Sequence, residues 1–205
     1  YQDFYSKTDN IYLEAQLDLL LGQALLASGE TEKADSYFQH AVNNYPETYD
    51  AYSALLALLD ANQPVDDLQR GLINYFRGQY DLADEAFTRY VQSDGQEKDK
   101  ALYYQALAAR AKGVEMMSLA SEERLASNQQ AGTPYDQQAV ALWKELVDTY
   151  PQSSYLVHAI EDIVYTQQAY MNNPELAAQT ALTYVSAQPY ASYAPSLLFS
   201  AGRNY

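Results

Sequence analysis

The sequence offers few side chains of the types that carry out covalent or acid–base chemistry. It contains no cysteine, which excludes thiolate nucleophiles, zinc–thiolate sites and disulfides. Its two histidines, His40 and His158, have no carboxylate or second histidine at ligand spacing along the chain. Because catalysis and metal binding require several such groups to converge, we predict a solvated or packing role for both histidines.

Carboxylates are plentiful, but their spacing does not favour catalysis. Neighbouring residues in a helix point about 100° apart, so adjacent acids do not converge on one substrate. We interpret these pairs as a charged solvent face and a complement to helix N-termini. The loop around Asp94 lacks the oxygen spacing of a calcium site. No nucleotide-binding, metalloprotease or nucleophile-elbow motif is present, so we predict no catalytic, cofactor or metal site and no enzyme within these residues. The adjacent acid pairs are Asp66–Asp67, Asp84–Glu85, Glu122–Glu123 and Glu161–Asp162.

Charge and hydropathy exclude two classes of partner. The chain has 205 residues, with 12 basic and 27 acidic side chains and a net charge of −15. This charge disfavours nucleic acid and anionic lipid, which bind basic surfaces. No apolar run approaches the roughly 20 residues that span a bilayer, so we expect no membrane insertion. The polar first ten residues predict that no signal peptide lies in this sequence, which leaves open one in a longer parent.

The pattern of apolar residues predicts an all-α chain. Segments of 10–16 residues between glycines and prolines carry apolar positions three and four apart, as in Leu17, Leu20, Leu21, Ala24 and Leu25. No segment alternates polar and apolar residues over the length of a strand. Helices therefore have to position whatever site the chain carries.

The helices follow a 34-residue spacing. With Gly22 at position 8, small or turn residues fall at positions 15, 20 and 27, Phe38 at position 24 and Pro46 at position 32. Gly71 and Phe87 take positions 8 and 24 of another such repeat. This pattern resembles the tetratricopeptide repeat, which implies an α-solenoid, a right-handed superhelix of antiparallel helix pairs.

We predict one domain over residues 1–205, divided into repeats of unequal regularity. In segment 49–63 the second helix is missing or merged, and residues 113–138 form an insertion with added helix and an exposed loop from Asn128 to Pro134. The repeats span about 15–48, 49–63 (partial), 64–97, 100–151 (with the insertion), 152–189 and 195–205 (truncated).

The resemblance also indicates where a partner would bind. In tetratricopeptide repeats the first helices line a concave groove, which accommodates a peptide or another part of the same protein. The Lys and Asn set that clamps a carboxylate terminus in some of these domains is absent. The groove positions in this sequence are Gln16, Leu19, Gln23, Leu26, Leu68, Leu72 and Tyr75, with Val65 beside them.

A narrower resemblance lies in Asp60–Val91, "DANQPVDDLQRGLINYFRGQYDLADEAFTRYV", and in the following "KALYYQALAARAKG". These segments resemble the helical superhelix that precedes the catalytic domain of bacterial soluble lytic transglycosylases. The resemblance implies a non-catalytic scaffold within a larger exported protein of the cell envelope that acts on peptidoglycan. The catalytic Glu-Ser pair of that family is absent from this sequence, so the active site would lie beyond Tyr205.

Two hypotheses remain open at this stage. The first is the scaffold of a cell-wall lytic enzyme, whose partner is another domain of the same chain and, through it, peptidoglycan. The second is a free-standing adaptor that binds a protein or peptide in its groove, with a cytoplasmic location still possible. An enzyme complete within these residues is disfavoured, because no acid, base and nucleophile converge.

Overall fold

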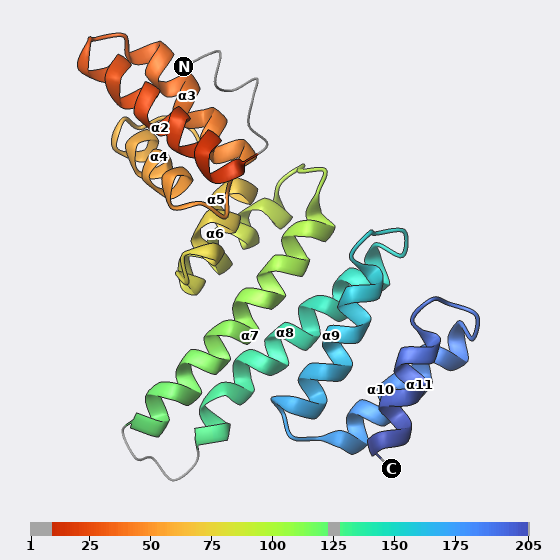
Figure 1. Cartoon of the computed structure of the whole chain (residues 1–205). Coiled ribbons are helices and arrows are strands. Elements are labelled where there is room, and N and C mark those ends of the chain that lie inside the picture. Colours follow the sequence, from red (N-terminus) through yellow and green to blue (C-terminus); the bar gives the residue numbers. More distant parts are fainter. Residues whose placement is uncertain (1–9, 123–127, 205) are drawn as a thin grey trace. The chain divides into compact units, whose positions relative to one another are not determined.

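The computed structural model describes residues 10–122 and 128–204, which contain ten α-helices and no strand. The chain divides into two compact units, Tyr1–Tyr90 and Val91–Tyr205. Figure 1 labels the helices of both. Successive helices pack against each other in both units, as α2 does against α3 and α8 against α9, so the prediction of an all-α solenoid of helix pairs is confirmed. The single domain over 1–205 and the handedness of the superhelix stay predictions.

From residue 10 onward, unit 1 forms five helices, three of which end in the same way. After α2, α4 and α5 a residue in the left-handed conformation follows: Gly29, Asn62 and Gly78, with φ of 84°, 55° and 72°. The amide after each of them donates to the carbonyl five residues earlier, as in Glu30 N to Leu25 O at 2.9 Å. Glycine and asparagine tolerate this conformation, which is why the helices stop there. The five helices are α2 Ile11–Ala27, α3 Thr31–Asn44, α4 Tyr49–Asp60, α5 Asp67–Phe76 and α6 Tyr80–Gln92.

Glycines allow two helix pairs of unit 1 to approach closely. A Cβ atom added at Gly22 of α2 would lie less than 3.0 Å from three ring atoms of Phe38 in α3. Gly71 of α5 faces Phe87 of α6 in the same way. Both phenylalanines are buried, at 2% and 0% exposure, so the ring of each second helix occupies the space that a side chain on the first would need. The spacing of positions 8 and 24 predicts this contact, and the structure confirms it.

No helix lies between α4 and α5, in agreement with the missing or merged second helix of segment 49–63. The short connection brings α5 against α3 and α4, where Ile73 joins their buried core. The Gln39 side chain of α3 donates to the carbonyl of Pro64 at 2.8 Å and fixes this connection. As a result α5 is buried on more than one side, which affects two of the predicted groove residues.

Unit 2 is built on two elongated helices. The buried core joins α7 to α8 and α9 through Trp143 and the small residues around it, and a second core joins α9, α10 and α11. The side chain of Asn173 caps α10 by accepting from the amide of Leu176 at 3.0 Å. The helices are α7 Lys98–Glu122, α8 Asn128–Thr149, α9 Leu156–Ala169, α10 Pro174–Ala187 and α11 Ala194–Asn204.

The predicted exposed loop from Asn128 to Pro134 is wrong, because these residues form the first turns of α8. The insertion lengthens α7 and α8 instead of the turn between them. A Cβ at Gly132 would lie 2.8 Å from the carbonyl oxygen of Gly113, so the two glycines let the helix backbones meet. Composition alone indicates a loop here, whereas the contact between two distant glycines favours a helical hairpin. No helix in the described residues is long and apolar enough to cross a membrane.

We expect the close approach of the helices to make Gly22 and Gly71 intolerant of substitution. Gly22→Ala and Gly71→Ala should each lower the free energy of unfolding by about 1–3 kcal/mol, because the added methyl group overlaps a buried ring. Gly202→Ala is the matched control, since Gly202 lies in a helix with nothing within 4 Å of its Cβ position. It should raise stability by up to about 1 kcal/mol through helix propensity. Urea unfolding followed by far-UV circular dichroism measures all three, and equal effects at the three positions would contradict the packing argument.

One buried carboxylate gives the α7–α8 hairpin a pH-dependent stability. Asp136 of α8 is 0% exposed, and neither of its carboxylate oxygens accepts a hydrogen bond from the described residues. Burial raises the pKa of Asp136 from 3.8 to about 6, although the positive charge of Arg110 opposes the shift. The unfolded chain retains the lower pKa, so ionisation destabilises the folded state increasingly as pH rises from about 4 to about 6.

We therefore predict that Asp136→Asn stabilises the protein at neutral pH but not in acid. The gain over the parent protein should be about 1–3 kcal/mol larger at pH 7.5 than at pH 4, because only the parent chain buries a charge at the higher pH. Urea unfolding of both proteins at the two pH values gives the difference directly. A gain that is the same at both pH values would show that Asp136 is already protonated or solvated throughout.

Candidate interaction surface

Three predicted groove residues of α2 lie on one exposed face. Gln16, Gln23 and Leu26 are exposed, and Leu19 between them is partly buried against the core of unit 1. Asn10 caps the helix by accepting from the amide of Tyr12 at 3.0 Å. The structure therefore presents a continuous surface along one helix, and the binding role of these residues stays a prediction.

The α2 face is more apolar than the predicted groove set indicates. Tyr12, Leu20 and Leu26 expose 62%, 47% and 48% of their surface. Helix α2 also buries Ala15 and Leu17 on its other side, so apolar residues occur on both its buried and its exposed face. Exposed apolar side chains that gather on one face commonly mark a contact with another molecule.

The groove residues predicted on α5 do not join this surface. Leu68 and Leu72 are 1% and 3% exposed and belong to the packed interior, so their assignment to a ligand-binding groove is wrong in this structure. The reason is the short connection after α4, which packs α5 against α3 and α4. Tyr75 is partly buried, and its ring packs edge-on against Phe76 at 5.2 Å. Val65 is partly buried against the core of α3 and α4.

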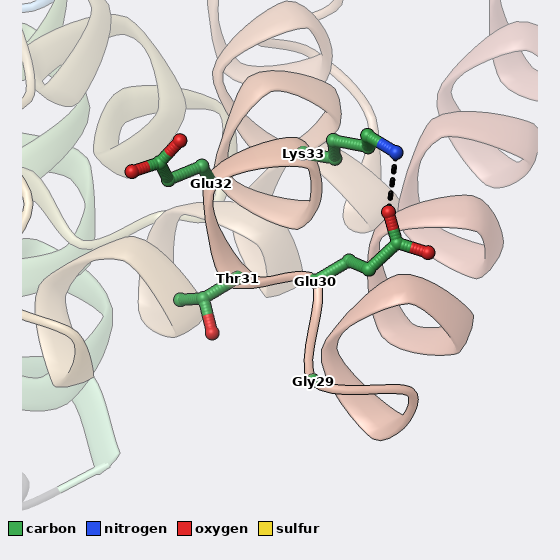
Figure 2. Close-up of a pocket in the computed structure, with 5 residues that line it drawn as sticks. All are labelled: Gly29, Glu30, Thr31, Glu32 and Lys33. Carbon is green, nitrogen blue, oxygen red and sulfur yellow. Dashed lines mark hydrogen bonds and ion pairs between the residues drawn. The ribbon is translucent and has the colours of Figure 1, made fainter.

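A shallow hollow lies at the turn between α2 and α3 (Figure 2). Gly29, in the left-handed conformation, opens the turn, and Glu30 and Lys33 point toward each other and form an ion pair across one turn of helix. The hydrogen bond from Lys33 to Glu30 is the main cause of the raised pKa of Lys33. Thr31 and Glu32 point away from this pair, so the groups lining the hollow do not converge on a ligand.

A buried acid on α2 explains the position of His40. The side chain of Asp18 is 1% exposed, and its Oδ2 atom lies 2.7 Å from Nδ1 of His40 in α3. The ring of Tyr45 packs edge-on against His40 at 5.7 Å. Burial, followed by a hydrogen bond to Glu14, raises the pKa of Tyr45. His40 thus has a carboxylate partner 22 residues away, which the local spacing could not reveal.

In unit 2, Arg110 connects α7 to α9, which are the first helices of two successive predicted repeats. Its Nη1 atom donates to Oδ1 of Asp162 in α9 at 2.6 Å and to the hydroxyl of Thr166 at 3.3 Å. Its guanidinium carbon lies 5.0 Å from the centre of the Trp143 ring and 5.6 Å from that of Tyr170. Arginine suits this position because its planar cation can donate to a carboxylate and stack on rings at the same time.

Tyr103, about two helical turns before Arg110 on α7, completes this network. Its hydroxyl donates to Oδ2 of Asp162 at 3.1 Å, and its ring stacks on Tyr155 at 4.8 Å. Burial is the main cause of the raised pKa of Tyr103, and the negative charge of Asp162 adds to it. The interpretation of Glu161–Asp162 as a solvated acid pair is therefore wrong for Asp162, which is paired on both oxygens. These groups satisfy one another, so the network fixes α7 against α9.

Comparison with known families places one repeat on this chain. Residues 16–48, which cover most of α2, all of α3 and the turn after it, match the family model described as a tetratricopeptide repeat. Comparison with curated proteins and with solved structures found no match. The matched segment contains the exposed residues Leu20 and Leu26 of α2 and the contact between Gly22 and Phe38, whereas Tyr12 lies before it. Among the described residues, no three His, Cys, Asp or Glu side chains cluster as a metal site requires.

We expect the Arg110 network to contribute strongly to the stability of unit 2. Arg110→Gln should lower the free energy of unfolding by about 2–4 kcal/mol, because Asp162 would remain partly buried without its cation. Lys100→Gln is the matched control on the same helix: its ion pair with Glu97 is longer, at 3.4 Å, and more exposed, and should contribute less than about 1 kcal/mol. The fluorescence of Trp143, the single tryptophan, reports unfolding of this unit. Equal losses in both variants would contradict the assigned role of Arg110.

Proposed function

We propose that this protein is a helical scaffold that binds a protein partner through the exposed face of α2. One observation carries the proposal: helices α2 and α3, of which residues 16–48 match the tetratricopeptide repeat, leave Tyr12, Leu20 and Leu26 exposed on the first helix. Repeats of this kind generally bind proteins, and the first helix is the one that faces the partner. The face carries no charged residue among these positions, which suits an apolar helix or an extended segment.

The finer proposal concerns the protein to which this scaffold belongs. We propose a larger exported protein that resembles the soluble lytic transglycosylases, with the scaffold positioning a peptidoglycan-cleaving domain in the cell envelope. Its support is the sequence of Asp60–Val91, which forms α5 and α6 in the structure. The coding sequence around this segment tests it: a following lysozyme-like domain with a Glu-Ser pair is expected. Without such a domain, the free-standing adaptor remains.

The binding proposal predicts that a charge on α2 abolishes partner capture. In pull-downs from the source organism, Leu26→Asp should lose the proteins that the parent chain retains, because a carboxylate would have to be buried in an apolar contact. Leu82→Asp is the matched control: Leu82 of α6 is exposed to a similar extent, 45% against 48%, but lies on a second helix. Mass spectrometry of the captured proteins compares the variants.

Circular dichroism should show that both variants keep the fold, since both leucines are about half exposed. Two outcomes would contradict the proposal. The first is a partner that Leu26→Asp retains as well as the parent chain does. The second is equal loss of the partner with Leu82→Asp, which would indicate a general effect of added charge.

A further inference from the structure

A second surface, in unit 2, has the features of a side-chain-sized binding site. Helices α9 and α11 form a hollow of about 290 Å³ between them. Val164 and Leu197, which are 3% and 2% exposed, form its apolar floor. This volume lies at the small end of ligand sites, so it suits one long side chain of a partner and not a whole cofactor.

Polar side chains without partners surround this floor. Glu161 and Gln168 of α9 and Ser196 and Ser200 of α11 line the hollow. None of the four side chains forms a hydrogen bond or ion pair within residues 10–122 and 128–204. All four offer acceptor oxygens, and Glu161 offers a full negative charge, so the rim suits a ligand that donates hydrogen bonds.

The charge around the hollow favours a cation. Between Lys144 and Arg203 the sequence contains no lysine or arginine. Arg110 of α7 is already paired with another carboxylate, since its Nη1 atom lies 2.6 Å from Oδ1 of Asp162. No lysine or arginine of α9, of α10 or of α11 up to Gly202 is therefore available to neutralise the carboxylate of Glu161, and the ionisable base of α9 is His158, for which no ion pair with Glu161 is found among the described residues. An anionic group would be repelled there, and an apolar side chain would desolvate Glu161 without compensation.

The ring of Tyr165 adds a second attraction for a cation. It lines the hollow and is 53% exposed. The guanidinium of Arg110 lies 6.0 Å from the centre of the same ring, so the protein itself places a cation against this tyrosine. A ring that is half exposed has room for a second cation from outside.

We propose that the hollow between α9 and α11 binds a lysine or arginine side chain of a basic peptide. The aliphatic stem lies on Val164 and Leu197, and the cationic head lies between the carboxylate of Glu161 and the ring of Tyr165. A second copy of this chain is a poor occupant, because it carries 27 acidic and only 12 basic residues. The inference rests on the proposed protein-binding function and adds the charge of the partner and a contact in unit 2.

Selection from a random peptide library tests the charge of the partner. The whole 205-residue chain is the target, and peptides rich in lysine and arginine are expected. The affinity of the best fluorescent peptide is then measured by anisotropy against substituted proteins. Glu161→Gln should weaken it about tenfold, because it removes the charge but keeps the shape. Tyr165→Leu should weaken it about threefold, because it keeps an apolar side chain but removes the ring.

Two controls separate this site from general attraction and from α2. Glu175→Gln removes an exposed carboxylate of α10 that does not line the hollow, and it should change the affinity by less than about twofold. Leu26→Asp alters the face of α2 and should leave the affinity for the basic peptide within about twofold of the parent value. The fluorescence of Trp143 confirms that unit 2 remains folded in the variants, and far-UV circular dichroism checks the fold of Leu26→Asp, whose substitution lies in unit 1.

The outcomes distinguish this inference from the proposed function. Selected peptides without basic residues, or a basic peptide that binds Glu161→Gln as tightly as the parent chain, would overturn the inference and leave the pull-down result on α2 standing. Loss of the basic peptide with Leu26→Asp would overturn it as well, by moving the contact to unit 1. If neither the library nor the pull-down yields a binder, the proposed function fails and the inference fails with it.

Discussion

The contact between a glycine on one helix and a phenylalanine on the next is the constraint on which the structure of unit 1 depends. Gly22 against Phe38 and Gly71 against Phe87 set the separation within two helix pairs. With the separation fixed, the small residues Ala34 and Ala83 can be buried completely. Hydrophobic burial then stabilises pairs whose helices are too short to be stable alone in water.

The fold could be predicted wherever its determinants lie within one repeat. The positions of Gly22, Gly29 and Phe38 predict the helix pair and its turn, because contacts at fixed offsets recur in every such repeat. The helical structure of the insertion could not be predicted in the same way, because Gly132 and Pro134 are residue types typical of a loop. What makes this segment helical is its contact with Gly113, and no local pattern records that partner.

For the candidate surfaces too, features set by position within one repeat could be predicted, and features set by residues distant in the sequence could not. The exposure of Gln16, Gln23 and Leu26 agrees with their positions on a first helix. Leu68 and Leu72 hold equivalent positions but are buried, because the short connection after α4 moves α5 into the core. Arg110 and Asp162 are 52 residues apart in the sequence, so their pairing, and with it the fixed position of α9, could be seen only in the structure.

The stretch without lysine or arginine between Lys144 and Arg203 has a consequence for how this part of the protein can be regulated. Acetylation and ubiquitin attachment use lysine amines, so neither can modify α9, α10 or the hollow beside α11 directly. Hydroxyl groups are the modifiable side chains there, with Ser196, Ser200 and Tyr165 around the hollow itself. A phosphate on any of them would add negative charge beside Glu161, so a kinase would have a direct means of changing the electrostatics of this surface.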